Sequence, residues 1–225
     1  MSTVTLYGHW ICPFATRVKF ALAQRGIDHV EFDLPPSAVR PDGFELPDEF
    51  VEHSPRLEIP MVRVDDEFLA DSIPILLWLE DVCDQPGLLP LAADQREVVI
   101  DRIHWLDDHL MKPVGGVYYG TDPERISRAG DALQRGFEEV DGWLADDRWL
   151  AGSEPTLAEA IMVPIYVRLD GLRALGFEHR LPSRVEAHRV ACSQLPGWPD
   201  VRWSSDQHDE FVGRFLKYRE LADRL

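Results

Sequence analysis

The sequence has few cysteines and few lysines, and it contains no long apolar run. The three cysteines, Cys12, Cys83 and Cys192, are far apart in sequence and do not form a disulfide framework. No apolar run approaches the roughly 20 residues that are needed to cross a bilayer. The chain opens directly with strand-like sequence, so we expect no signal peptide. Together these absences predict a protein of the reducing cytoplasm.

Basic residues are also scarce relative to acidic ones. The chain has 23 lysines and arginines against 40 aspartates and glutamates, which gives a net charge of −17 at pH 7. This balance argues against nucleic acid or an anionic membrane as a partner. The eight histidines show no spacing typical of metal ligands, so we expect no metal site.

What is present in the first 84 residues is an alternation of strand and helix patterns. Residues 3–7 and 29–34 alternate as half-buried strands do, and a helical spacing lies between them and stops at Gly26. A short helix is expected around residues 48–52. Residues 61–64 and 67–70 form two strands around an acidic turn, and a helix follows Asp71 and Ser72. The order predicts an α/β thioredoxin-like domain over residues 1–84.

Beyond this region the pattern is helical only. Residues 85–91 contain two prolines and one glycine and are the expected linker. Residues 92–225 are therefore predicted to form an all-helical C-terminal domain. Thr156 to Glu159 matches a capping box, in which Thr accepts one backbone N–H and Glu another. Ser183 to Glu186 matches the same pattern.

Cys12 falls at the corner between the first strand and the first helix. Pro13 suits the first helical position, because its missing N–H costs nothing there. A thiol at a helix N-terminus faces unpaired N–H groups and the positive end of the dipole, which favours the reactive thiolate. A free cysteine is, however, more often a small buried hydrophobic residue. From these residues alone both interpretations stay open.

Four segments, in this order, resemble the cytosolic glutathione transferase superfamily and its omega-like, cysteine-type branch in particular. The first two are Cys12-Pro13-Phe14-Ala15, similar to the omega active-site tetrad, and residues 54–60, similar to the segment that ends in the family's cis-proline. The other two are Asp71-Ser72, similar to the family's acidic residue and serine, and residues 150–159, similar to the N-capping box of its buried central helix.

The resemblance implies glutathione as co-substrate and Cys12 as the catalytic residue. It implies that the ligand is held by Phe14, by the Ile59 backbone and Pro60, by Asp71 for the amino group, and by Ser72 for the γ-glutamyl carboxylate. Without the resemblance, a trans Ile59-Pro60 bond and simple helix caps at Asp71 and Ser72 would be expected.

The resemblance also suggests an acceptor pocket in a cleft between the two domains. Aromatic and histidine side chains are its candidates, and each is equally plausible as packing: Trp10, Trp105, His109, Tyr118 and Tyr166. The expected partners are glutathione and a small electrophilic or disulfide substrate, and the expected assembly is a homodimer.

The expected function is glutathione-dependent thiol transfer through a mixed disulfide at Cys12. Conjugation of glutathione to an electrophile, activated by the hydroxyl of Tyr7 or Thr16, is the alternative within enzymes. A non-catalytic scaffold or regulator of the same fold is the alternative outside them. One departure from the family pattern leaves the scaffold interpretation open. The position that a lysine often occupies in the family falls near Leu46, which cannot make the same contact, so Arg40, His53 or Arg56 would have to take its role.

Overall fold

A computed structural model describes residues 3–178 and 180–222, and it divides into two compact units. The first unit reaches Leu89 and also includes Leu195–Val201; the second covers Pro90–Gln194 and the chain from Arg202 onward. The boundary after Leu89 falls within residues 85–91, where the linker was expected. The two units are described separately below.

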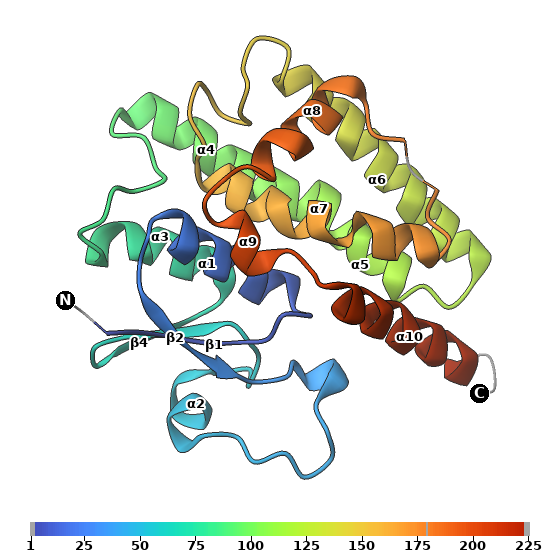
Figure 1. The fold of residues 1–225 in the computed structure, drawn as a ribbon, viewed down its shortest axis with the longest axis horizontal. Coiled ribbons are helices and arrows are strands. Elements are labelled where there is room, and N and C mark those ends of the chain that lie inside the picture. The colour runs from blue at the N-terminus through green and yellow to red at the C-terminus, as the bar shows by residue number, and fades with distance from the viewer. Residues whose placement is uncertain (1–2, 179, 223–225) are drawn as a thin grey trace. The chain divides into compact units, whose positions relative to one another are not determined.

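The first unit is built on a four-stranded mixed sheet (Figure 1). Its elements, in chain order, are β1 (Val4–Gly8), α1 (Pro13–Gln24), β2 (His29–Asp33), a 3-10 turn (Ser37–Val39), α2 (Asp48–His53), β3 (Met61–Val64), β4 (Glu67–Ala70), α3 (Ser72–Val82) and α9 (Trp198–Val201). The strand order is β2-β1-β3-β4, with β1 and β2 parallel and β3 antiparallel to both of its neighbours. The thioredoxin-like arrangement is confirmed.

Alternation along β1 decides which helices cover each face of the sheet. Tyr7 stands opposite Phe32 and Met61 in the register of the sheet. Its ring packs 6.0 Å from that of Phe50 on α2, so α2 covers this face. Helices α1 and α3 pack against one another and cover the other face (Figure 1). Successive side chains of a strand point to opposite faces of the sheet, so the sheet can pack against helices on both of its faces.

Helix α9 joins the first unit although the sequence placed it in the helical domain. It packs against α1, and the N–H of Gly197 donates to Oε1 of Gln24 at 3.1 Å. A Cβ at position 197 would lie 2.7 Å from the Phe20 carbonyl oxygen, so this close approach requires glycine. The contact joins residues about 170 positions apart, which no local pattern predicts.

The second unit is entirely helical in its regular elements, as expected. They are α4 (Ala93–Leu106), a π-helical turn (Asp107–Met111), α5 (Lys112–Tyr118), α6 (Pro123–Trp143), α7 (Leu157–Ala174), α8 (Ser183–Cys192) and α10 (Ser205–Ala222). Helix α7 packs against α4, α5, α8 and α10, so it is buried on several sides. Within residues 3–178 and 180–222, no helix has the length and apolar character that a membrane span requires.

The two expected capping boxes have different outcomes. Thr156 caps α7 and Glu159 completes the box by accepting from the Thr156 N–H. The box expected at Ser183 is wrong. Pro182 is the N-cap of α8, so Ser183 is already inside the helix, and Glu186 pairs with Arg189 instead.

Candidate active site around Cys12

Cys12 is the N-cap residue of α1, at the end of the loop that follows β1. Its backbone is extended, with φ −82° and ψ 117°, and its N–H donates to the His9 carbonyl oxygen at 3.0 Å. Pro13 occupies the first helical turn, as the sequence predicts. The side chain is 5% exposed. The local sequence therefore sets the thiol at the positive end of a helix, where a thiolate is stabilised.

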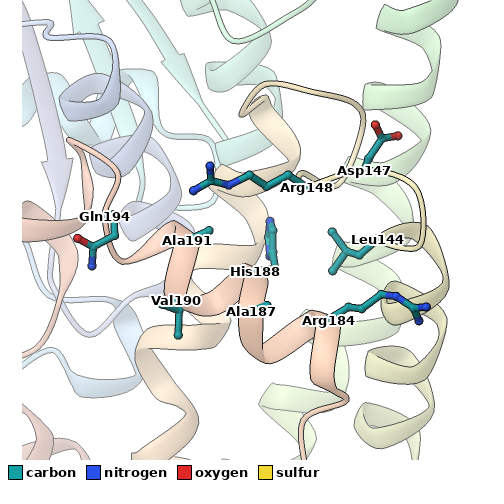
Figure 2. Close-up of a pocket in the computed structure, with 9 residues that line it drawn as sticks. All are labelled: Leu144, Asp147, Arg148, Arg184, Ala187, His188, Val190, Ala191 and Gln194. Carbon is teal, nitrogen blue, oxygen red and sulfur yellow. The ribbon is translucent and has the colours of Figure 1, made fainter.

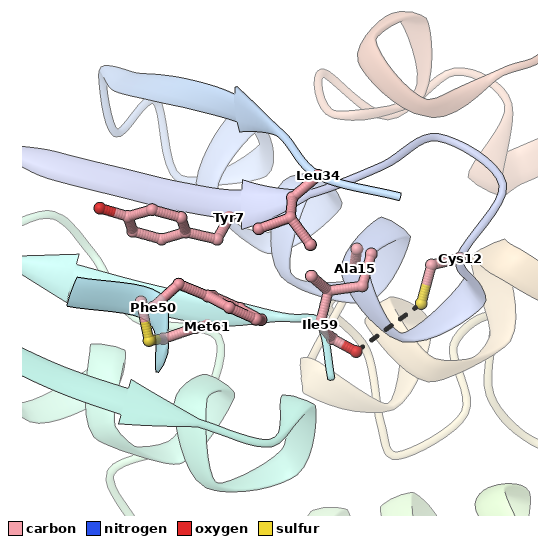
Figure 3. Close-up of a cluster of buried hydrophobic side chains, with 7 residues drawn as sticks. All are labelled: Tyr7, Cys12, Ala15, Leu34, Phe50, Ile59 and Met61. Carbon is pink, nitrogen blue, oxygen red and sulfur yellow. Dashed lines mark hydrogen bonds between the residues drawn. The ribbon is translucent and has the colours of Figure 1, made fainter. Parts of the chain in front are cut away.

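The thiol of Cys12 faces the segment before β3. Its Sγ lies 3.9 Å from the carbonyl oxygen of Ile59, as Figure 3 shows. Cys12 belongs to a cluster of buried side chains that also includes Ala15 and Leu34. The Ile59-Pro60 bond is cis, which confirms the implication of the resemblance. Pro60 is buried. The structure thus brings together the cysteine and the expected backbone site for a cysteinyl group.

Asp71 and Ser72 lie where α3 begins. Asp71 is its N-cap, with φ +74°, a left-handed conformation that costs a non-glycine residue about 1–3 kcal/mol. Its N–H donates to the Pro60 carbonyl oxygen at 3.3 Å, so the two expected ligand segments are joined directly. The Asp71 carboxylate makes no capping hydrogen bond and pairs with Arg56. Ser72 is buried at the first helical position.

Arg17 belongs to this site, although the sequence analysis did not single it out. It is 1% exposed on α1, and its guanidinium donates to Oγ of Ser72 at 3.2 Å. The same group lies 4.8 Å from the centre of the Phe14 ring, which is 39% exposed. An arginine within the mostly apolar sequence of α1, five residues after the cysteine, is the sequence signal that would have identified it.

The two hydroxyl groups considered for conjugation are both engaged. The Tyr7 hydroxyl donates to Glu49, and burial, followed by this hydrogen bond, raises the pKa of Tyr7 to about 12. Figure 3 shows this hydroxyl pointing away from Cys12. Thr16 donates its hydroxyl to the Cys12 carbonyl oxygen at 2.8 Å. Neither group is therefore directed at the thiol.

Comparisons with known proteins agree with this arrangement. Residues 11–82 match the family model for the glutathione S-transferase N-terminal domain. Maleylacetoacetate isomerase of Rattus norvegicus is 30% identical over 169 residues, which is 71% of this chain and 74% of the rat protein. The chain belongs to the glutathione S-transferase superfamily.

A second relative and a solved structure match a larger share of the chain. Maleylpyruvate isomerase of Ralstonia is 28% identical over 203 residues, 84% of this chain and 92% of that protein. The crystal structure of rice GST1 in complex with glutathione superposes with a TM-score of 0.84 at 19% identity, covering 96% of this chain and 97% of the rice chain. The glutathione S-transferase fold is thus shown, whereas the omega-like branch stays a prediction.

The three candidates for the lysine of glutathione S-transferases have different surroundings. Arg40 donates to the carbonyl oxygens of Pro35 and Leu57. His53 stacks on Phe68 with ring centres 4.0 Å apart. Arg56 alone among the three pairs with a residue expected to bind glutathione, Asp71. It is the best-placed substitute, and this assignment stays a prediction.

The expected acceptor residues occur in different surroundings. Trp10 is half-buried in the first unit and packs near His9, with ring centres 5.5 Å apart. In the second unit Trp105 and His109 stack at 4.4 Å, so these two are brought together.

The other two expected acceptor residues have neighbours of their own. Tyr118 packs with Phe215 on α10 at 4.7 Å. Tyr166 is 4% exposed, and its hydroxyl lies 2.8 Å from Nδ1 of His188. An acceptor role for any of these residues stays a prediction. Within the part of the chain that the structure describes, no group of three or more potential ligands could hold a metal ion.

Proposed function

We propose that this glutathione S-transferase is a glutathione-dependent thiol transferase of the omega-like type, with Cys12 as its nucleophile. The observation that carries the proposal is the position of the Cys12 thiol, at the N-terminus of α1 and 3.9 Å from the Ile59 carbonyl oxygen. A thiol attacks as its thiolate, and a helix N-terminus favours that form. The chemistry uses reduced glutathione, which suits the cytoplasm expected from the sequence.

The reaction consists of two thiol–disulfide exchanges. The Cys12 thiolate attacks the glutathionyl sulfur of a substrate mixed disulfide; the substrate sulfur leaves as a thiolate and takes up a proton. Cys12 is then joined to glutathione by a disulfide. The thiolate of a second glutathione attacks the bound glutathionyl sulfur, which releases oxidised glutathione and restores the Cys12 thiolate. The substrate is reduced to its thiol, and one free glutathione is oxidised, because the other half of the product disulfide is the glutathionyl group that came from the substrate.

The surrounding residues suit the glutathione molecule. Because Oγ of Ser72 accepts from Arg17, its own hydrogen can donate to the γ-glutamyl carboxylate. The buried Arg17 cation adds a favourable field at the same place. Asp71 can bind the amino group while it retains Arg56 as its neighbour. The Ile59 backbone and Pro60 are expected to meet the cysteinyl group, and the exposed Phe14 ring to cover the ligand.

Conjugation through a protein hydroxyl is less well supported than thiol transfer. A phenol whose pKa is raised to about 12, and which already donates to Glu49, is a poor activator of the glutathione thiol. Thr16 is occupied by the Cys12 carbonyl oxygen. A scaffold without chemistry would have no need of a cysteine at the N-cap of α1.

A second candidate function comes from the names of the relatives. The rat relative is a maleylacetoacetate isomerase and the Ralstonia relative a maleylpyruvate isomerase. A glutathione-dependent isomerase can add the glutathione sulfur to a conjugated double bond, allow rotation about the resulting single bond, and release the sulfur again. In that mechanism Cys12 forms no disulfide and serves only to position or activate glutathione.

Substitution of Cys12 separates the two functions. Cys12→Ser should abolish reduction of a cysteine–glutathione mixed disulfide, because a hydroxyl is a far weaker nucleophile than a thiolate at neutral pH. Cys83→Ser is the matched control and should leave the rate unchanged. Each variant is also assayed for cis–trans isomerisation of maleylacetone and for conjugation of an aromatic halide, with circular dichroism to confirm folding.

The pattern of activities decides among the alternatives. Disulfide reduction that persists in Cys12→Ser would refute the thiol transferase. Isomerisation by the wild type without disulfide reduction would favour the second candidate. A wild-type protein that lacks all three activities and flows through a glutathione-affinity column would favour the scaffold. The homodimer implied by the family is tested by light scattering on the eluting peak.

A further inference from the structure

The turn between β1 and α1 consists of residues 9–12 and ends at the thiol of the candidate active site. The N–H of Cys12 donates to the carbonyl oxygen of His9 at 3.0 Å, which closes the turn. The Cys12 carbonyl oxygen in turn accepts the N–H of Thr16 at 3.0 Å, in the hydrogen bond that begins α1. The conformation of this turn therefore sets where Cys12 stands relative to the N-terminus of the helix.

The side chain of His9 makes a second hydrogen bond within the turn. Its Nδ1 lies 3.2 Å from the backbone nitrogen of Ile11, whose N–H donates to it. Ile11 is 6% exposed and the side chain of His9 is 12% exposed, so the contact is largely shielded from water. A shielded N–H that loses its acceptor is unfavourable, so this hydrogen bond constrains the turn.

His9 does here what Asp, Asn or Ser does in many turns. Those residues are favoured at the first position of a turn, because their side-chain oxygen accepts the N–H two residues further along. His9 is the first residue of this turn, and Nδ1 of an imidazole is as many bonds from Cβ as Oδ1 of an asparagine. Histidine can therefore fix the turn as asparagine would, provided that Nδ1 carries no proton.

The contacts of His9 specify which of its ring nitrogens carries the proton. A backbone N–H can only donate, so Nδ1 is the acceptor and Nε2 carries the proton. Nε2 faces Asp33, which stands beside Gly8 in the register of β1 and β2 and places its Oδ1 3.9 Å away. The carboxylate favours a proton on Nε2 and thereby leaves Nδ1 available to Ile11.

We propose that His9 is a positioning residue for the Cys12 thiol, which it holds at the N-terminus of α1 by fixing the turn that precedes it. This inference rests on the proposed function, because it concerns the same nucleophile. Without Nδ1, the Ile11 N–H loses its acceptor and the turn shifts. The thiolate then lies less favourably in the field of the helix N-terminus, which falls off within about one turn. His9 itself forms no bond in either thiol–disulfide exchange.

Alkylation of Cys12 by iodoacetamide as a function of pH, followed by peptide mapping, tests the proposal. His9→Phe keeps a ring but removes the acceptor. At about pH 6.5 it should slow alkylation about three- to tenfold, because a smaller fraction of the thiol is ionised. The difference should shrink toward about pH 9.5, where most of the thiol is ionised in both proteins. His9→Asn supplies Oδ1 as acceptor and should restore the rate to within about twofold of the wild type.

His29→Phe is the matched control. The side chain of His29 is also 12% exposed, but it stands beside Val4 at the other end of β1, and its Nδ1 lies 3.1 Å from the Ile27 carbonyl oxygen. Its replacement should leave the alkylation profile of Cys12 unchanged.

Calorimetry with reduced glutathione supplies a second readout. Glutathione should bind His9→Phe and the wild type with affinities equal within about twofold, because the substitution leaves Asp71 and Ser72 in place. The rate of disulfide reduction should fall in parallel with the alkylation rate, since both depend on the thiolate.

Three results would overturn the role of His9. They are a His9→Phe profile equal to that of the wild type, a His9→Asn profile equal to that of His9→Phe, and a loss of glutathione affinity as large as the loss of rate. Circular dichroism verifies folding, and His9→Leu takes the place of His9→Phe if that variant does not fold. If the wild type reduces no disulfide, the proposed function fails, yet the alkylation profiles still decide the role of His9.

Discussion

Replacement of Glu80 should destabilise the first unit more than any exposed substitution on the same helix. Glu80 and Arg25 form a buried ion pair at 3.2 Å, with 5% and 1% of their side chains exposed. The other carboxylate oxygen of Glu80 accepts the N–H groups of Leu88 and Leu89 at 2.9 and 2.8 Å. The Glu80 carboxylate therefore connects α3 both to Arg25 at the end of α1 and to the segment that follows α3.

The magnitude follows from what each substitution leaves behind. Glu80→Ala removes the counter-charge of a buried arginine. In comparable buried pairs this lowers the free energy of unfolding by about 3–5 kcal/mol. Arg25 keeps four carbonyl acceptors, those of Leu79, Cys83, Gln85 and Pro86, which places the expected value at the lower end. Glu80→Gln keeps one acceptor oxygen but loses the charge, so about 1.5–3 kcal/mol is expected.

Urea unfolding gives the free energies, and Asp81→Ala is the matched control. Asp81 is the next residue of α3, has the same charge and is exposed, so its replacement should change stability by less than about 0.5 kcal/mol. Hydrogen exchange adds a local measurement: the Leu88 and Leu89 amides should exchange faster in Glu80→Ala. Equal stability of Glu80→Ala and Asp81→Ala, with unchanged exchange at both amides, would refute the reasoning.

Three further predictions concern the first unit and the thiols. Ser72→Ala should weaken glutathione binding by about 1–3 kcal/mol in calorimetry, because a charged carboxylate loses a donor; unchanged affinity would show a purely structural serine. Cys12 should react with iodoacetamide faster than Cys192, since burial raises the pKa of Cys192 well above its usual value; equal labelling by peptide mapping would contradict this. Hydrogen bonding to His29 lowers the pKa of Glu31 from 4.5 to about 2, so its stabilising effect is present above pH 4.5 and lost as the pH falls toward 2. The stability difference between wild type and Glu31→Gln should shrink over that range in acid-dependent urea melts, and a constant difference would exclude the linkage.

Local patterns in the sequence determined most of the first unit. Strands β3 and β4 span the residues that were predicted for them, because the acidic turn at residues 65 and 66 divides two short segments of strand-forming residues. The corner position of Cys12 is equally local, since Pro13 suits only the first turn of a helix. The box at Thr156 formed because both of its partners lie within one helical turn.

Local patterns did not determine how distant side chains combine. The S/T-x-x-E pattern at Ser183 failed because Pro182 took the N-cap position. Arg17 and Ser72 are separated by 55 residues and meet only when α1 and α3 pack together. The Tyr7 hydroxyl was a candidate activator until the fold placed Glu49 beside it.

In the second unit, local patterns likewise do not determine the surroundings of Arg148 and His188. No motif in the sequence singles out Arg148, which follows two aspartates, or His188. Only tertiary packing turns both nitrogens of His188 toward Glu159 and Tyr166 and brings Arg148 to a pocket that apolar side chains of α8 also line (Figure 2). Backbone hydrogen bonds and side-chain alternation act over a few residues, so a sequence determines its helices and strands locally. Burial and charge pairing act through space between distant segments, so the sites are decided by the fold.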